Sequence, residues 1–112
     1  MRDHHGTISA FHSEAAHVLG ARIREARNQR SLTLEDLGAL AGVHWTNIGK
    51  IERGQVHPSV ETLVRLASAM DADPQVFVTG LTADMYPRPR HKLTANDLIR
   101  EREERSRHRD AE

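Results

Sequence analysis

The sequence predicts an all-α protein, in which a domain of five short helices lies between a flexible N-terminal segment and a C-terminal linker with a helical tail. Apolar residues in the middle of the 112-residue chain recur at intervals of three and four, the period of a helix with one buried face. The alternation and the Val, Ile, Tyr and Phe runs that mark strands are missing. Since the chain has no cysteine, helix packing alone must hold it together.

The first two expected helices begin at recognisable caps. Ser13 is an acceptable N-cap for a helix that ends near residue 30. The sequence Thr33-Leu34-Glu35-Asp36 has the capping-box pattern, with Leu32 placed to pack on Leu37. This second helix should end at Gly42, where glycine permits a left-handed conformation. The buried face of the first helix is expected to comprise Ala16, Leu19, Ile23 and Ala26.

Three more helices follow, over residues 45–53, 59–70 and 75–79. A glycine comes directly after the first and the last of them and should stop each one. Asp73-Pro74 supplies an N-cap and a first-turn proline for the last helix, whose core anchor should be Phe77. One face of the 59–70 helix is apolar and consists of Leu63, Leu66, Ala67 and Met70.

Two prolines in Tyr86-Pro87-Arg88-Pro89-Arg90 mark the end of the helical domain, because they favour an extended linker. A second capping box at residues 94–97, followed by i, i+4 Glu–Arg pairs, predicts a last helix. Beyond the cap, Leu98 and Ile99 form the only apolar surface of this helix. This surface is too small to hold the helix against the domain, so we expect the helix to be solvated or to depend on a partner. The chain therefore divides into an N-terminal segment (1–12), a helical domain (13–81) and a linker with a charged tail (82–112).

Composition excludes several classes of protein. No apolar run approaches the roughly 20 residues that cross a bilayer, and the polar start of the chain is unlike a signal sequence, so we expect a soluble cytoplasmic protein. The chain has no Gly-rich phosphate loop and no Ser/His/acid set, and neither an enzyme nor a cofactor is expected. Lys plus Arg and Asp plus Glu both number 16. A nucleic-acid partner must therefore be argued from a motif, not from net charge.

The most informative pattern is a pair of short helices over residues 34–53, joined by a turn that begins at Gly42. A near-perpendicular crossing requires a small residue where one helix presses on the other, and Gly38 supplies it. The turn requires a residue without a side-chain penalty, and Gly42 supplies that. The inner faces of the two helices then share the apolar residues Leu37, Ala41, Val43, Ile48 and Ile51.

Over residues 18–81 the chain resembles the helix-turn-helix family of Cro and the phage repressors, also called the XRE family. Four stretches carry the resemblance: Ile23–Arg27, Leu32–Leu37, Ile48–Gly54 and Pro58–Leu63. It implies a five-helix domain whose third helix lies in the major groove of DNA. The implied function is a sequence-specific transcriptional regulator, of the repressor type, that binds operator DNA as a homodimer and is associated with the nucleoid.

The resemblance also implies which residues contact DNA. Thr33 should offer its helix N-terminus to a phosphate, and Asn47 or Lys50 should hydrogen-bond a base edge. Arg27 and Glu52 match a pair that forms a partly buried ion pair between the first and third helices. The positions carried over are Thr33, Leu34, His44, Trp45, Thr46, Asn47 and Lys50, with Arg53, Gln55 and His57 as candidates for the flanking backbone.

The chain departs from the family at several of these positions. The family often has glutamines where Leu34 and Trp45 stand, and these two side chains are limited to apolar contacts, for instance with a thymine methyl. His44 replaces a Ser or Thr cap and should cap poorly. Gly49 costs about 1 kcal/mol relative to alanine in a helix. The glycine either allows the phosphate backbone to approach the 45–53 helix closely or packs against the second helix.

Less specific interpretations stand beside these. On these interpretations Trp45 is an ordinary packing residue that does not contact a base, and Lys50 is a solvated charge on the helix surface. The tail arginines between residues 100 and 109 would bind phosphates, although the neighbouring acidic residues oppose this. Four histidines suggest a metal site, but their spacing fits no common one and we expect no metal: His4, His5, His12 and His17.

Two kinds of partner are expected. A dimer is needed because one short helix buries too little surface for useful specificity, and it would form through Gln75–Leu81 or through the tail helix. The alternative function is an antitoxin, in which the helical domain regulates its own gene and residues 87–112 fold on a toxin partner.

Overall fold

The computed structural model describes residues 12–87 and 94–111, and every regular element in these ranges is helical. The all-α prediction is therefore confirmed, and the five expected helices of the domain are α2 to α6. A 3₁₀ helix, η1, was not predicted. The elements are α2 (Glu14–Gln29), α3 (Leu34–Ala41), α4 (Trp45–Glu52), α5 (Val60–Ala69), α6 (Gln75–Val78), η1 (Ala83–Met85) and α7 (Ala95–Ala111).

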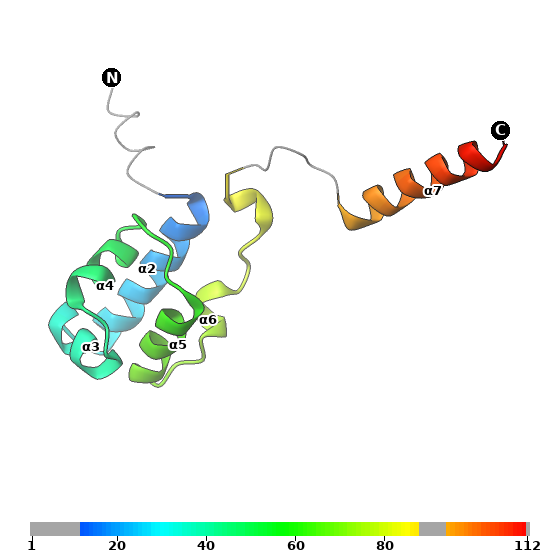
Figure 1. Ribbon diagram of the computed structural model, residues 1–112. Helices are drawn as coiled ribbons and strands as arrows, with labels where there is room; N and C mark the ends of the chain where they lie inside the picture. Colours follow the sequence, from blue (N-terminus) through cyan, green and yellow to red (C-terminus); the bar gives the residue numbers. More distant parts are fainter. Residues whose placement is uncertain (1–11, 88–93, 112) are drawn as a thin grey trace, which may run out of the picture.

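Helices α2 to α6 pack around one apolar core (Figure 1). Helix α2 contacts α4 and α6, while α3 contacts α4 and α5. The predicted faces point inward, although Ala26 and Leu63 lie at the edge of the core and are only partly buried. The largest fully buried side chains come from all five helices: Ile23, Leu37, Ile48, Ile51, Leu66 and Phe77.

Helix α2 begins at its predicted cap, and α6 has Pro74, one residue after the predicted cap Asp73, at its N-cap position. The Ser13 hydroxyl accepts a hydrogen bond of 3.0 Å from the amide of Ala16 at the start of α2. The carboxylate of Asp73 accepts one of 2.9 Å from the amide of Gln75 at the start of α6. Gly42 ends α3 with a φ of 70°, in the left-handed region that favours glycine.

Two glycines allow helices to cross at close range. A Cβ atom on Gly38 would lie 2.6 Å from the carbonyl oxygen of Val43, at the turn that leads into α4. This agrees with the expectation that a small residue is needed there. A Cβ atom on Gly20 would lie 2.1 Å from the carbonyl oxygen of Ile51, so α2 and α4 also touch through a glycine, which the sequence analysis did not identify.

Arg22 of α2 and Arg30, which directly follows α2, bind the C-terminal ends of other helices. Arg30 donates from Nε to the carbonyl of Met70, at the end of α5, over 2.8 Å. Arg22 donates from Nη1 to the carbonyls of Phe77 (3.1 Å) and Thr79 (2.6 Å), at the end of α6. These bonds satisfy carbonyl groups that helix ends leave without partners, and they tie both helices to α2.

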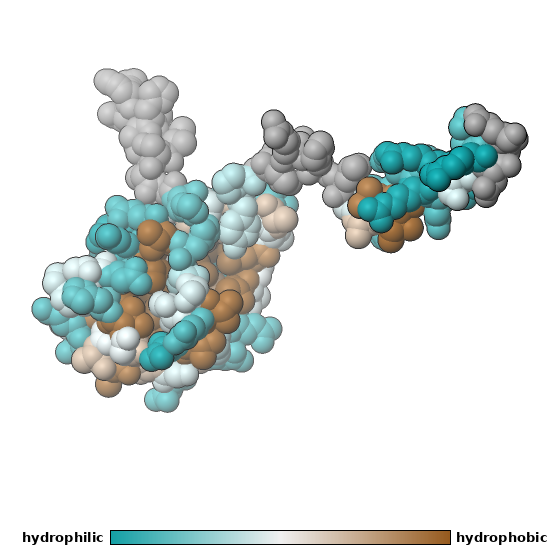
Figure 2. Space-filling view, viewed as in Figure 1, coloured by the Kyte–Doolittle hydropathy of each residue, from teal (hydrophilic) through white to brown (hydrophobic). Residues whose placement is uncertain are grey.

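Helix α7 lies apart from the other helices in Figure 1. Its surface is mostly hydrophilic in Figure 2, where one apolar area marks its first half. Leu98 and Ile99 are exposed there, by 39% and 52%. None of the helices that the structure describes is apolar and long enough for a membrane span. Most of the predicted N-terminal segment and part of the linker, residues 88–93, lie outside the described residues.

Candidate DNA-binding surface

Helix α4 divides cleanly into a buried and an exposed face. Ile48 and Ile51 are fully buried, and Gly49 and Glu52 face inward beside them. The other face carries the residues that the resemblance assigns to base contacts. All five of these are exposed: His44, Trp45, Thr46, Asn47 and Lys50. The structure therefore brings these five predicted DNA-contacting residues together on one exposed edge of α4, which we call the reading edge.

His44 caps α4 with its own ring. Its Nδ1 atom accepts a hydrogen bond of 3.2 Å from the amide of Thr46 and lies 2.7 Å from the Thr46 hydroxyl. His44 therefore does act as the N-cap of α4, through the amide two residues on, whereas Ser13, Thr33 and Ser59 each accept from the amide three residues on.

Gly49 provides space between α3 and α4. A Cβ atom on Gly49 would lie 3.7 Å from Cδ1 of Leu34 and 3.0 Å from Nη1 of Arg53. The Leu34 side chain thus extends from α3 across to α4, and the Arg53 guanidinium lies back over the same glycine. Of the two interpretations of Gly49, packing against the second helix is the one that matches this geometry.

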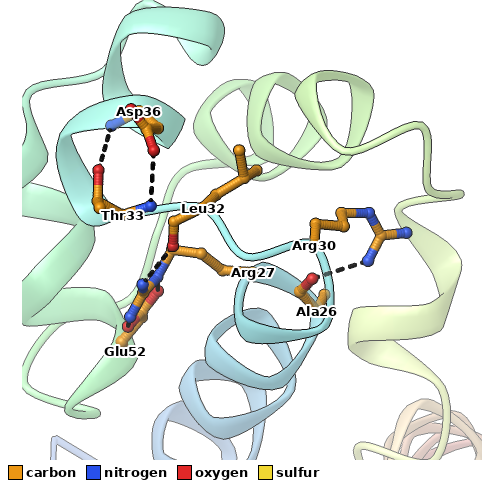
Figure 3. A network of polar contacts seen from close by, with 7 residues as sticks. All are labelled: Ala26, Arg27, Arg30, Leu32, Thr33, Asp36 and Glu52. Carbon is orange, nitrogen blue, oxygen red and sulfur yellow. Dashed lines mark hydrogen bonds and ion pairs between the residues drawn. The ribbon is translucent and has the colours of Figure 1, made fainter.

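The start of α3 is held by a reciprocal capping box (Figure 3). The amide of Thr33 donates to Oδ2 of Asp36, and the amide of Asp36 donates to the Thr33 hydroxyl, both over 2.9 Å. Hydrogen bonds from the Thr33 backbone and then from its side chain lower the pKa of Asp36, since both favour the carboxylate. The N-terminus of α3 therefore has a fixed position beside α4.

Arg27 and Glu52 form an ion pair through two parallel hydrogen bonds. Nε of Arg27 lies 2.7 Å from Oε2 of Glu52, and Nη2 lies 2.8 Å from Oε1. The remaining Nη1 donates to the carbonyl of Leu32 over 2.8 Å, as Figure 3 also shows. The hydrogen bond to Glu52 raises the pKa of Arg27 and outweighs the opposing effect of burial. One guanidinium thus joins α2, α4 and the turn before α3.

The turn after α4 contains Arg53, Gln55 and His57, and all three are exposed. His57 has close neighbours within the protein: its Nε2 lies 3.3 Å from the Ser13 hydroxyl, and its ring centroid lies 4.4 Å from that of His12. Tyr86 lies on the ring too, at 5.3 Å between centroids. Partial burial, and then the charge of His12, lower the pKa of His57. His57 therefore has a structural role that the sequence analysis missed.

Of the four histidines that suggested a metal site, His12 and His17 are described. His12 packs on His57, and His4 and His5 lie outside the described residues. Within residues 12–87 and 94–111, no group of three or more His, Asp or Glu side chains is placed to hold a metal ion.

The reading edge carries one cation, and a second cation lies directly beside it. Lys50 lies on α4 and Arg53 directly after it, and both are exposed. Within the described parts of the chain, neither forms an ion pair with a carboxylate. Both charges are therefore available to a polyanion.

Comparison with known proteins places this geometry in one family. The family model described as helix-turn-helix matches residues 23–77. The control protein C.SmaI of Serratia marcescens is 32% identical over 62 residues, which cover 55% of this chain and 74% of that protein. The HTH-type transcriptional regulator DdrOP3 of Deinococcus deserti is 43% identical over 47 residues, which cover 42% of this chain but only 36% of the relative.

Solved structures agree with these sequence relatives. The restriction-modification controller protein C.AhdI from Aeromonas hydrophila is 34% identical with a TM-score of 0.54, over 55% of this chain and 94% of that one. The P22 c2 repressor, solved in complex with a synthetic operator, is 30% identical with a TM-score of 0.53, over 57% and 97%. The chain belongs to the helix-turn-helix family of Cro and the phage repressors, whose members are DNA-binding transcriptional regulators and not enzymes.

Proposed function

We propose that this protein binds an operator as a homodimer, inserts α4 in the major groove and represses transcription from that site. One observation carries the proposal: α4 buries Ile48 and Ile51 and leaves Trp45, Thr46, Asn47 and Lys50 exposed to solvent. A helix held by its apolar face can enter a groove without giving up the contacts that fold the protein. The similarity to the P22 c2 repressor, which was solved in complex with a synthetic operator, supports operator binding by this fold.

The residues of the edge have complementary roles. Asn47 suits a bidentate contact to adenine, and Lys50 suits the acceptor atoms of guanine. Arg53 and Gln55 lie where the phosphate backbone would pass beside the base contacts. The capping box engages the amides of Thr33 and Asp36, so the amides of Leu34 and Glu35 would face a phosphate at the start of α3.

Helix α6 is the dimer surface that we favour. Phe77 is buried in the core, whereas Val76 and Val78 on either side of it are exposed by 53% and 38%. Arg22 holds the end of this helix through two carbonyls, so the apolar side chains are presented on a fixed element. A symmetric pair would place the two α4 helices about 34 Å apart, one turn of DNA.

Selection of bound sequences from a random DNA pool tests the proposal. We expect a nearly palindromic motif, and an affinity for it that falls steeply between two salt concentrations because phosphate contacts release counterions. Lys50→Ala should weaken binding to that motif about tenfold or more and relax the base preference at one position. Arg24→Ala, which removes an exposed cation of α2, is the control and should change little. Recovery of no common motif would overturn the proposal.

The dimer requires a separate measurement. Val76→Asp should shift the protein towards monomer in analytical ultracentrifugation and weaken binding to the full operator, because an exposed charge replaces an apolar contact. The helix content should stay unchanged, since Val76 lies outside the core. A variant that remains dimeric would remove α6 from the interface.

An antitoxin is the second candidate, and the exposed Leu98 and Ile99 of α7 favour it. Two neighbouring apolar side chains on an otherwise charged helix are suited to folding against a partner protein. A chain that lacks residues 87–112 separates the two functions. The truncated chain should keep its DNA affinity in either case. If the protein is an antitoxin, the truncated chain should no longer retain the toxin that the full chain retains in a pull-down, whereas a regulator has no such partner to lose.

A further inference from the structure

We propose that Leu34 and Trp45 together form an apolar contact for the C5-methyl group of a pyrimidine in the operator. The inference rests on the proposed function and deepens it, because it names the base feature that the first residues of α3 and α4 select. Leu34 has no hydrogen-bonding group and the indole N–H of Trp45 is a single donor, so neither side chain can make the bidentate contact that identifies a base by its polar edge.

The two side chains line one shared depression on the surface, which we call the Trp45 depression. Its walls come from the last turn of α2, from the turn before α3, from the start of α3 and from the first residue of α4. Trp45 is 44% exposed and Leu34 is half-buried, so apolar atoms of both face the solvent. The depression is lined by Arg27, Ser31, Leu32, Thr33, Leu34, Glu35 and Trp45.

The apolar walls are held in place before any ligand arrives. The Trp45 ring stacks on the ring of His44, with centroids 6.0 Å apart and planes inclined by 22°. His44 is itself fixed by its two contacts with Thr46. Leu34 lies over Gly49, where a Cβ atom would meet its Cδ1 at 3.7 Å, an ordinary van der Waals distance. A surface that is already ordered loses less conformational freedom on binding, so its contacts contribute more fully to affinity.

The surroundings favour DNA over an apolar protein segment as the occupant. The depression lies beside the N-terminus of α3, which attracts an anion, and on the same side as the exposed edge of α4. Lys50 and Arg53 add two exposed cations to that edge. In the major groove the C5-methyl group of thymine is the apolar feature, and 5-methylcytosine presents the same group.

A uridine scan of the operator tests the inference without altering the protein. Each thymine of the selected operator is replaced in turn by deoxyuridine, which removes only the methyl group, and Kd is measured by fluorescence anisotropy. We expect Kd to rise about four- to tenfold at one position in each half-site, the effect of one buried methyl group, and to stay unchanged elsewhere. Placing cytosine and then 5-methylcytosine at that position distinguishes the two sources, since only the methylated base should recover affinity.

Variants assign the effect to the two side chains. Leu34→Gln and Trp45→Gln should bring the ratio of uridine to thymine Kd close to one. Leu40→Gln is the matched control: it removes the same side chain from the same helix at a position that is 61% exposed and outside the depression, and it should keep the ratio. Circular dichroism establishes that each variant is folded.

The outcomes separate this inference from the proposed function. If the wild-type protein binds a specific operator but tolerates uridine at every thymine, the methyl contact is wrong and operator binding stands. A methyl effect that persists in folded Leu34→Gln and Trp45→Gln variants would also overturn the assignment. If no DNA sequence is preferred over another, the proposed function itself fails.

Discussion

The helical domain and α7 use the same chemistry with different consequences. Both contain arginine–carboxylate pairs at hydrogen-bond distance. In the domain, the side chains of Arg27 and Glu52 are 12% and 5% exposed and join two helices. In α7, Arg100 and Asp97 are 65% and 40% exposed and lie three residues apart on one helix. Burial decides the difference. Water solvates the charges of an exposed pair whether or not they are paired, so the pair contributes little to stability, whereas each charge of a buried pair depends on its protein partner.

The comparison shows how the reading edge is positioned. No described side chain of α7 is buried, so its helical form depends on local caps and charge pairs. Helix α4 has only eight residues, yet its orientation is fixed by Ile48, Ile51 and Glu52 on its inner face. The side chains that would touch DNA therefore depend on contacts made on the opposite side of the same helix.

Removing the buried carboxylate should have the largest effect. Glu52→Ala leaves the Arg27 guanidinium without its charged partner in a partly buried place, and should lower the free energy of unfolding by about 3 to 5 kcal/mol. Denaturant titration measures this loss. Glu61→Ala is the control, because it breaks an exposed pair with Arg65 and should cost no more than about 0.5 kcal/mol. Equal losses in the two variants would contradict the contrast between buried and exposed pairs.

A methyl group at the α2–α4 crossing should have the next largest effect. In Gly20→Ala the new Cβ meets the backbone carbonyl of Ile51, which cannot move without displacing α4, and a loss of about 2 to 3 kcal/mol is expected. In Gly49→Ala the new Cβ meets chiefly the flexible end of Arg53, so the helix should gain up to about 1 kcal/mol. Thermal unfolding of the pair measures both signs. A tolerated Gly20→Ala would mean that α2 and α4 are less tightly packed.

Gly38 and Gly20 show what the sequence could and could not predict. Gly38 was anticipated because it lies within one compact motif, whose geometry requires a small residue there. The role of Gly20 was not anticipated, because the helical period indicates which residues face inward but not which residues of other helices they contact. Its neighbour, the carbonyl of Ile51, lies 31 positions along the chain. Local pattern thus predicted the helices and their caps, and left this long-range contact open.

The reading edge could be predicted to a similar extent. The spacing of the apolar residues Ile48 and Ile51 defines the buried face of α4, so the sequence was sufficient to predict that the opposite face is exposed. The cap by His44 was missed because a ring nitrogen reaches the amide only with a particular side-chain geometry. The contact of His57 with His12 depends on bringing the start of the domain to the turn after α4, which no local pattern encodes.

The histidine contact makes a prediction about pH that is smaller than the first two. The pKa of His57 lies below its ordinary value of 6.5, because burial and then His12 disfavour its charged form. The unfolded chain therefore binds more protons between the two pKa values, and stability falls as the pH drops below about 6.5. Between about pH 7.5 and about pH 5.5, Tm should fall less in His57→Gln than in the wild type. An identical fall in both proteins would exclude His57 as a source of acid sensitivity.

The smallest effect is expected in α7. Arg105→Ala removes the exposed i, i+4 pair with Glu101, and should change the free energy of unfolding of the domain by no more than about 0.5 kcal/mol. Added salt should reduce even this difference, because screening weakens exposed pairs. Arg102→Ala, on the same helix, is the control. A loss above about 1 kcal/mol would mean that α7 is held by burial against the domain or a second copy, and the contrast between the two regions would then no longer hold.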